Sequence, residues 1–217
     1  LVLNSWMHTP AGFEMVDGVA YATDWWAIIF NPSMPYRLSH MLVASGLTAS
    51  FLVAGISAFR WLIKHQEKSV INGLKTGIYL AAILIPIQIL LGDLHGLNTK
   101  EYQPAKVAAM EGLWETQKGA PLVLFAIPNE ETRSNDFAIE IPGLASYVLT
   151  HEWDGEVKGL NEFEGEHPPV AMIFWMFRIM VGVGILMLLV SWTGAYQMIR
   201  KGNITRGMAR ILVAMMF

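Results

Sequence analysis

The 217-residue sequence contains no cysteine, which excludes disulfide bonds, thiolate metal sites and a cysteine nucleophile. Charged residues are also scarce, at 15% of the chain against about 25% in soluble domains, whereas 53% of the residues are hydrophobic. The formal net charge of −3 excludes the basic surface that is typical of a nucleic-acid-binding protein. No HExxH or HxxxH spacing indicates a zinc site, and no glycine-rich phosphate loop is present. This composition is typical of a membrane protein.

Three apolar runs are long enough to cross a bilayer, which takes roughly 20 residues. They cover Leu38 to Phe59, Thr76 to Gly92 with an extension from Val70 to Leu74, and Pro169 to Ile199. Pro86 lies within the second run and predicts a kink. Two shorter apolar stretches, Leu1 to Met7 and Ile211 to Phe217, are predicted to belong to further helices. The sequence therefore predicts an all-α polytopic transmembrane helix bundle with three full spans and two truncated ones.

These runs divide the chain into four parts. Residues 1–37 are expected to hold the end of a membrane helix and an external loop, with a short interfacial helix around Tyr21 to Phe30. Residues 38–92 are expected to form two transmembrane helices with a cytoplasmic loop, and residues 93–167 a second external loop. Residues 168–217 are predicted to form a transmembrane helix, a cytoplasmic turn and the start of a further helix. We expect the chain to be the central fragment of a larger protein, lacking both ends.

The distribution of basic residues predicts the orientation. Basic residues follow the first and the third run, at Arg60, Lys64, His65, Lys68, Lys75, Arg200, Lys201, Arg206 and Arg210. Loops rich in Lys and Arg lie in the cytoplasm, and two crossings separate the two basic clusters. The polar loop 93–167, in which acids outnumber Lys and Arg, is therefore predicted to lie outside.

His40 stands near the outer end of the first run. A histidine there is typical of a helix start at the membrane interface, and it is also a candidate axial ligand of haem iron. Val43, Ala44 and Leu47 share its helical face and are apolar, as a flat macrocycle requires. The spacing leaves both interpretations open.

Arg178 is the one charged residue in the third run, where a charge costs about 2.5–3.5 kcal/mol on insertion scales. It is expected to reach toward the surface, to pair with an acid of the loop, or to bind a haem propionate. Met180 is one of 13 methionines, most of which are expected to fill gaps in the core or face lipid. Gly182 and Gly184 follow it and leave room for a flat group. A His/Met pair would fill both axial positions of an iron.

The stretch from Gln103 to Lys118 carries a third group of candidates. Pro104 suits a first helical turn, and Glu111 and Glu115 share a helical face, with Lys118 three residues further on. Lys106 and Glu111 are five residues apart and do not share a face. An ordinary solvated helix explains this pattern. The alternative is a polar clamp for a ring-shaped substrate, with a carboxylate that takes up protons.

Three stretches resemble subunit I of the cytochrome bd quinol oxidases: LVLNSWMHTPAGFE at the start, GDLHGLNTKEYQPAKVAAMEGLWET, and FRIMVG at Phe177 to Gly182. The resemblance runs along the whole chain, and the short external loop is similar to that of the cyanide-insensitive branch. It implies that His40 and Met180 are the axial ligands of a low-spin b-type haem and that Arg178 lies beside this haem.

The resemblance also implies roles in the external loop 93–167. Lys106 and Glu111 match the lysine and glutamate that take part in quinol oxidation. Asn4 matches a polar position of the family's fourth helix, and the resemblance does not indicate its role.

The function implied by the resemblance is oxidation of ubiquinol or menaquinol by a terminal quinol:oxygen oxidoreductase of the respiratory chain, with electrons passing to the low-spin haem. The complete protein is expected to hold a high-spin b-type haem and either haem d or a further b haem, and the ligands of both are missing here. The fragment is therefore expected to be inactive alone. Expected partners are a second oxidase subunit and the lipid bilayer, with no nucleic acid, in the bacterial inner (plasma) membrane with loop 93–167 on the periplasmic side.

Three other functions were weighed against a role in quinol oxidation. In a membrane transporter or channel component without haem, Arg178 and the helix kinked at Pro86 would line a polar path. A membrane anchor would have no redox role. A di-haem cytochrome b requires paired histidines on two spans, and only His40 lies within an apolar run.

Overall fold

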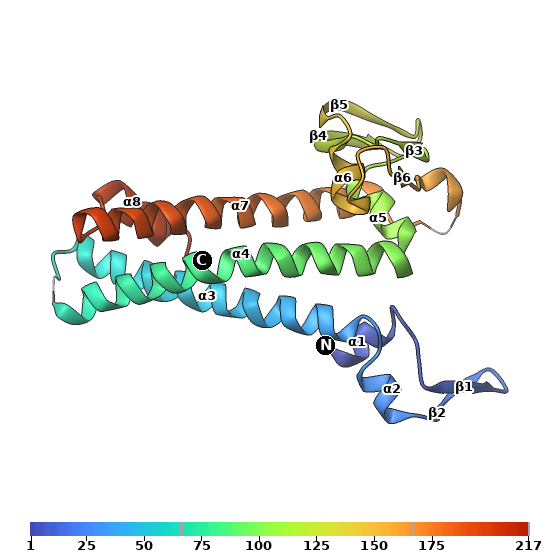
Figure 1. The fold of residues 1–217 in the computed structure, drawn as a ribbon, viewed down its shortest axis with the longest axis horizontal. Helices are drawn as coiled ribbons and strands as arrows, with labels where there is room; N and C mark the ends of the chain where they lie inside the picture. The colour runs from blue at the N-terminus through green and yellow to red at the C-terminus, as the bar shows by residue number, and fades with distance from the viewer. Residues whose placement is uncertain (66, 166, 217) are drawn as a thin grey trace. The chain divides into compact units, whose positions relative to one another are not determined.

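The computed structural model describes residues 1–65, 67–165 and 167–216. Three of its helices are long and apolar enough to cross a membrane, by length and composition: α3 (Met34–Leu62), α4 (Lys68–Tyr102) and α7 (Val170–Lys201) (Figure 1). α3 and α4 contain the first two apolar runs, and α7 contains the third run except for its first residue, Pro169. The prediction of three helices of spanning length is confirmed.

Helix α4 continues beyond the end predicted for it. The apolar run ends at Gly92, but the helix extends to Tyr102. Residues 93–102 contain no proline, and the first helix-stopping signal is Pro104, which disfavours helical geometry at Gln103. The end of α4 therefore carries polar side chains beyond the apolar run. Pro86 lies inside the helix, and the kink predicted there stays a prediction.

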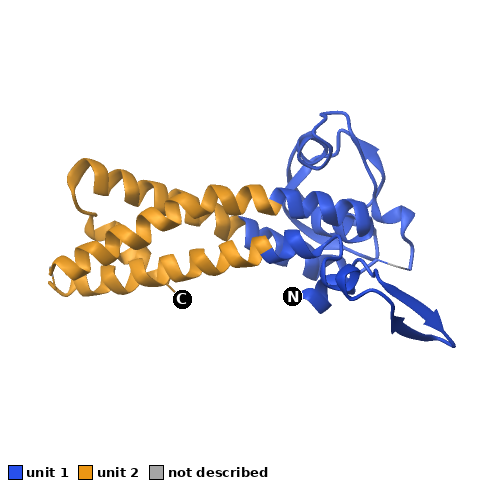
Figure 2. Cartoon of the chain, turned by 60° about the horizontal axis from the view of Figure 1, so that its bottom comes forward, with its two compact units in different colours: residues 1–38, 93–181 blue, residues 39–92, 182–217 orange. Residues whose placement is uncertain are grey.

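The chain divides into two compact units, residues 1–38 with 93–181 and residues 39–92 with 182–217 (Figure 2). The second unit is helical and ends in α8 (Arg206–Ala214). Its core is formed by buried side chains from all four of its helices, including Leu47, Phe51, Leu74, Ile78, Ile85, Val190 and Leu212. At Gly77 a Cβ atom would lie 2.6 Å from the carbonyl oxygen of Ser50 and 2.8 Å from Ala54 Cβ. Glycine thus allows α3 and α4 to approach closely, as small residues do in membrane bundles.

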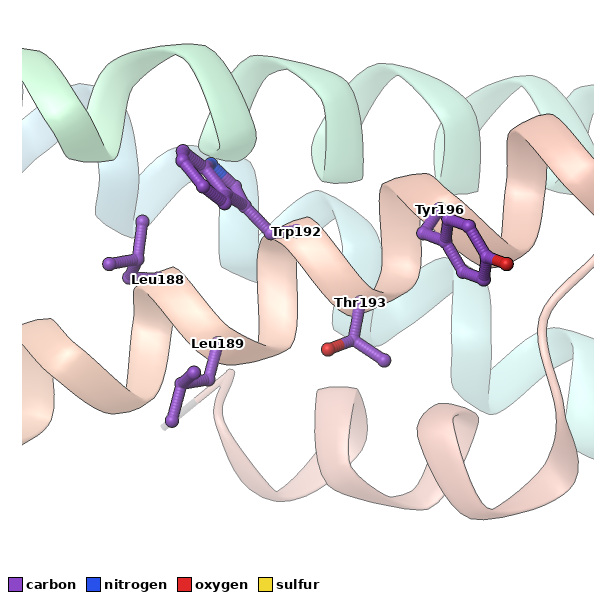
Figure 3. A pocket seen from close by; sticks show the side chains of 5 residues that line it. All are labelled: Leu188, Leu189, Trp192, Thr193 and Tyr196. Carbon is purple, nitrogen blue, oxygen red and sulfur yellow. The ribbon is translucent and has the colours of Figure 1, made fainter.

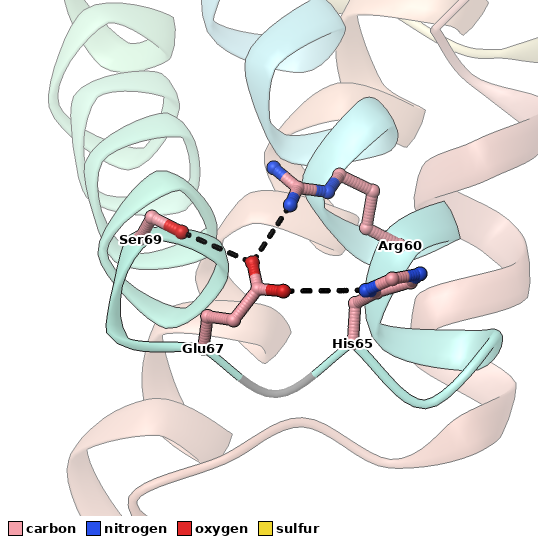
Figure 4. Close-up of polar contacts among 4 residues, drawn as sticks. All are labelled: Arg60, His65, Glu67 and Ser69. Atoms are coloured by element: carbon pink, nitrogen blue, oxygen red, sulfur yellow. Dashed lines mark hydrogen bonds and ion pairs between the residues drawn. The ribbon is translucent and has the colours of Figure 1, made fainter.

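The turn between α3 and α4 is organised around one acid, Glu67 (Figure 4). Arg60 Nη2 lies 2.8 Å from Glu67 Oε2, and His65 Nδ1 lies 3.3 Å from Oε1. Ser69 Oγ donates to Oε2 at 3.4 Å. The hydrogen bond with His65, and then the charge of Arg60, lower the pKa of Glu67. The single acid of the predicted cytoplasmic loop therefore joins the end of α3 to the start of α4.

The expected all-α fold needs correction in the first unit, which begins with α1 (Val2–Trp6) and a β-hairpin. Strands β1 (Phe13–Val16) and β2 (Val19–Ala22) pair antiparallel through a turn at Asp17 and Gly18. Both turn residues have positive φ, 50° and 78°, as a tight Asp-Gly hairpin turn requires. The interfacial helix predicted for Tyr21 to Phe30 is shorter, because α2 covers only Trp25–Ile29. Asp24 caps its N-terminus, with Oδ1 accepting from the backbone nitrogens of Trp26 and Ala27.

The external loop also contains strands. β4 (Leu122–Asn129) pairs antiparallel with β5 (Ser134–Ile141), and β3 (Gln117–Lys118) pairs with β6 (Glu156–Val157). The segments α5 (Pro104–Glu111), α6 (Leu144–Thr150) and the 3₁₀ turn Leu160–Glu162 complete it. Asn129 Oδ1 accepts from the backbone nitrogens of Glu131 and Thr132 and so shapes the β4–β5 turn. Local turn chemistry, which the overall acidity of the loop does not reveal, explains these strands.

Candidate functional site

Helix α5 places Glu111 at its last position. Pro104 occupies the first turn, where its missing N–H costs nothing. Gly112 ends the helix in the left-handed conformation, with φ 68°. The single helical face expected for Glu111, Glu115 and Lys118 is therefore wrong, because the helix stops before the last two and Lys118 lies in β3.

The carboxylate of Glu111 forms a buried ion pair with Arg178 of α7. Arg178 Nη2 lies 2.7 Å from Glu111 Oε2, and the two side chains are 11% and 7% exposed. Arg178 Nε donates to the carbonyl oxygen of Val123 in β4 at 2.6 Å. The guanidinium also lies over the rings of Phe174 and Phe177, at 4.8 and 5.3 Å from their centroids. A carboxylate, a carbonyl and two aromatic faces thus surround the charge.

Neighbouring contacts fix this geometry. Phe174 is fully buried and packs with Val123, and its ring lies 3.2 Å from where a Cβ at Gly112 would be. Asn135 Nδ2 donates to the carbonyl oxygen of Gly112 at 2.8 Å, and Trp114 Nε1 donates to Asn135 Oδ1 at 2.9 Å. The end of α5, strand β5 and helix α7 are therefore held together around the ion pair.

Two residues expected to serve different ligands are thus in contact. Sequence analysis placed Glu111 in a quinol site and Arg178 beside a haem, and it also considered that Arg178 pairs with an acid of the loop. The structure confirms this pairing and identifies the acid. Sixty-seven residues separate the two in sequence, so no local spacing signals the contact.

Lys106 lies five residues before Glu111 on α5 and is half-buried. Burial lowers the pKa of its ammonium group, and the positive charge of Arg37 lowers it further. Among the ion pairs of the described residues, none includes Lys106. Lys106 and Glu111 therefore belong to one short helix but have different surroundings.

His40 lies in the second unit, on α3, and contacts α4. Its Nε2 lies 2.9 Å from the side-chain nitrogen of Gln88, which can donate to the imidazole only if Nε2 carries a lone pair. A Cβ at Gly92 would lie 3.3 Å from the His40 ring, so glycine makes room for it. The same lone pair is the one that a haem iron would take, and in this respect His40 fits an axial ligand.

Met180 belongs to the first unit and is 52% exposed. Gly182 and Gly184 follow it on α7, and a Cβ at either position would meet no atom within 4 Å. An imidazole and an accessible thioether are the donor set of a low-spin haem, so the residue types fit this group. The meeting of His40 and Met180 at one iron stays a prediction.

A groove on α7 has a different character (Figure 3). It is lined by Leu188, Leu189, Trp192, Thr193 and Tyr196. Trp192 Nε1 donates to the carbonyl oxygen of Ala82 at 3.1 Å. The lining of this groove is mostly apolar and contains no charged side chain.

Sequence analysis missed Arg37 and Gln88. Arg37 precedes His40 by three residues on α3 and therefore shares its helical face, which is a signal available in the sequence. Gln88 is recognisable only from its contact with His40 across two helices.

The ion pair between Glu111 and Arg178 is expected to dominate the stability of this part of the first unit. Removing one member of a buried pair leaves an uncompensated charge and costs about 3–5 kcal/mol. We expect Arg178→Gln and Glu111→Gln each to lower the free energy of unfolding of the full-length protein by this amount. The double variant should lose clearly less than the sum, in chemical denaturation measured in detergent.

The exposed pair of Arg133 and Glu164 provides a matched control. Its atoms are 2.6 Å apart, but its side chains are 60% and 63% exposed. Arg133→Gln should therefore cost only about 0.2–1 kcal/mol. Strictly additive losses at Glu111 and Arg178 would show that the two charges do not interact.

Comparison with known proteins is consistent with these features. The family model of cytochrome bd terminal oxidase subunit I matches residues 1–217. A putative cytochrome bd menaquinol oxidase subunit I of Bacillus subtilis is 37% identical over 192 residues, which are 86% of this chain and 43% of the relative. A cytochrome bd ubiquinol oxidase subunit 1 of the same organism is 32% identical and covers 93% of this chain and 45% of the relative.

A solved structure shows the same fold. The bd oxidase from Geobacillus thermodenitrificans superposes with a TM-score of 0.90 at 32% sequence identity, over 98% of this chain and 50% of that one. The chain thus spans about half the length of the relatives it matches. Because the family model covers its whole length, the chain belongs to the cytochrome bd terminal oxidase subunit I family.

Proposed function

We propose that this chain is the quinol-oxidising part of a cytochrome bd quinol oxidase, a terminal quinol:oxygen oxidoreductase of the respiratory chain. The proposal depends mainly on one observation. The Glu111 carboxylate forms an ion pair with Arg178, and Arg178 lies two residues before Met180 on α7. Family membership supports it, as do two relatives whose names specify menaquinol and ubiquinol. The residues described here are compatible with menaquinol or ubiquinol as the substrate.

Glu111 is proposed to accept a proton from the quinol hydroxyl. Among the described residues, its Oε2 is bonded to Arg178, while Oε1 has no hydrogen-bond partner, and the side chain keeps a small exposed surface. Arg178 holds the carboxylate in place, so that Oε1 is oriented to receive a proton. Lys106, half-buried on the same helix, is proposed to bind the quinol oxygen.

His40 and Met180 are proposed to hold a low-spin b-type haem as its two axial ligands. When bound, this haem would supply one-electron transfer. Arg178, two residues from Met180 on α7, places a positive charge near this ligand and favours the reduced iron. Val43, Ala44 and Leu47 would provide an apolar face beside His40.

The rest of the oxidase is proposed to lie outside these residues. It would include a high-spin b-type haem, haem d or a further b haem, and a second subunit. The basic ends of α3 and α7 support a position in the bacterial inner membrane with loop 93–167 on the periplasmic side. Protons from the quinol would then be released outside.

Replacing Met180 tests the haem assignment. Met180→Leu in the full-length protein should abolish or strongly shift the low-spin haem band in reduced-minus-oxidised spectra, because leucine offers no donor atom. Met176→Leu, four residues earlier on α7 and 57% exposed, is the matched control and should leave the band unchanged. An unaltered band in Met180→Leu would remove this residue from the ligand set. Absence of any haem band from the wild-type protein would favour a transporter or channel.

Replacing Glu111 tests the proton acceptor. Glu111→Gln should reduce quinol turnover by about 100-fold or more, the range of general-base catalysis, but leave oxidation of an artificial one-electron donor nearly unchanged. Glu115→Gln, at an exposed position in the same loop, should have wild-type turnover with both donors. An equal loss with both donors in Glu111→Gln would mean that the carboxylate has only a structural role.

A further inference from the structure

A single residue, Gln103, joins the end of α4 to the start of α5. Helix α4 ends at Tyr102 and α5 begins at Pro104, and the backbone of Gln103 between them is not helical, with φ −141° and ψ 59°. Both helix ends belong to the first unit. Because rotation about the bonds of one residue can change the angle between two helices, contacts elsewhere in this unit must fix that angle.

Lys100, in the last turn of α4, makes such a contact with α6. Its Nζ donates to the carbonyl oxygen of Leu149 at 2.9 Å. Leu149 lies in the last turn of α6, where backbone carbonyls lack a partner within the helix and where a positive charge is favourable. Lys100 is half-buried, and none of the ion pairs among the described residues includes it. Its ammonium group therefore binds the end of α6.

Helix α6 in turn packs against α5. Ala145 and Leu149 of α6 are buried in one apolar cluster with Val107 of α5 and with Leu113, which follows α5. The three helices are thus connected in a closed circuit. One residue joins α4 to α5, apolar side chains join α5 to α6, and Lys100 joins α6 back to α4. Loss of the Lys100 contact would leave the angle between α4 and α5 less restricted.

The two polar residues of α5 depend on this circuit to different degrees. Glu111, at the last position of the helix, is bound to α7 by its ion pair with Arg178 at 2.7 Å. Lys106 lies in the first turn, close to the joint between α4 and α5, and has no ion pair among the described residues. The position of Lys106 therefore follows the angle between α4 and α5, whereas Arg178 holds Glu111 separately.

We infer that Lys100 is a positioning residue of the quinol-oxidising site, because its bond to the end of α6 fixes the angle between α4 and α5 and hence the place of Lys106. The inference rests on the proposed function, in which Lys106 binds the quinol oxygen and Glu111 accepts the proton. Lys100 acts through these helices and does not contact the quinol. It therefore affects the binding of quinol more than the rate at which bound quinol is oxidised.

Lys100→Met in the full-length oxidase tests the inference, because methionine is also unbranched but offers no donor. KM for quinol should rise about tenfold, which corresponds to about 1.4 kcal/mol and is close to the contribution of a hydrogen bond to a charged group. Turnover at saturating quinol and oxidation of an artificial one-electron donor should stay nearly unchanged, as expected for a loss of uniform binding. Lys100→Arg, whose guanidinium can still donate to the carbonyl, should restore most of the affinity.

Hydrogen–deuterium exchange provides a second readout that does not depend on turnover. In Lys100→Met the backbone amides of α5 and α6 should exchange faster than in the wild-type protein, because a contact that holds these segments is lost. Amides around Leu74 and Ile78, in the apolar core of the second unit, should exchange as before. Lys118→Met, at an exposed position of the same loop, is the matched control and should change neither KM nor exchange.

Two outcomes would overturn the inference in a Lys100→Met variant that has the circular dichroism spectrum of the wild type. One is unchanged exchange of α5 and α6, and the other is a wild-type KM under conditions in which Lys106→Met raises KM. A wild-type KM in Lys106→Met would instead contradict the proposed function, and exchange would then decide the inference alone. Lys100→Gln, which is neutral and shorter, provides the same test if Lys100→Met does not accumulate.

Discussion

The ion pair between Arg178 and Glu111 is the interaction on which the first unit depends. Arginine in the apolar run of α7 is costly without a partner, and a buried carboxylate is equally so. Their contact at 2.7 Å satisfies both charges, while the carbonyl of Val123 and the ring of Phe174 occupy the remaining sides of the guanidinium. The loop that contains α5 is thereby attached to the helix that carries Met180.

Charges in the first unit fall into three classes with different consequences. Arg178 is buried and paired, and it fixes the position of the proposed proton acceptor. Arg37 and Lys106 are half-buried and form no ion pair among the described residues. Pairs such as Arg133 and Glu164 are exposed and contribute little. The core of the second unit, in contrast, is apolar.

Sequence reasoning was accurate where one physical signal dominates. The three spans follow from the length of their apolar runs, and the N-terminal end of α5 follows from Pro104. The β1–β2 hairpin was missed although Asp17-Gly18 is a strong turn signal, because the segment was interpreted from its prolines and acids. The contact of Arg178 with Glu111 depends on a long loop folding back, which no spacing encodes. The roles of His40 and Met180 came from resemblance, since histidine and methionine have many uses in apolar helices.

The most direct test of the account is an experimental structure of the complete oxidase, with haem bound, at a resolution that shows carboxylate side chains. The account predicts that Arg178 contacts Glu111 and that Glu111 presents its free oxygen to the quinol site. Arg178 bound to a haem carboxylate, with Glu111 lacking any cationic partner, would contradict it.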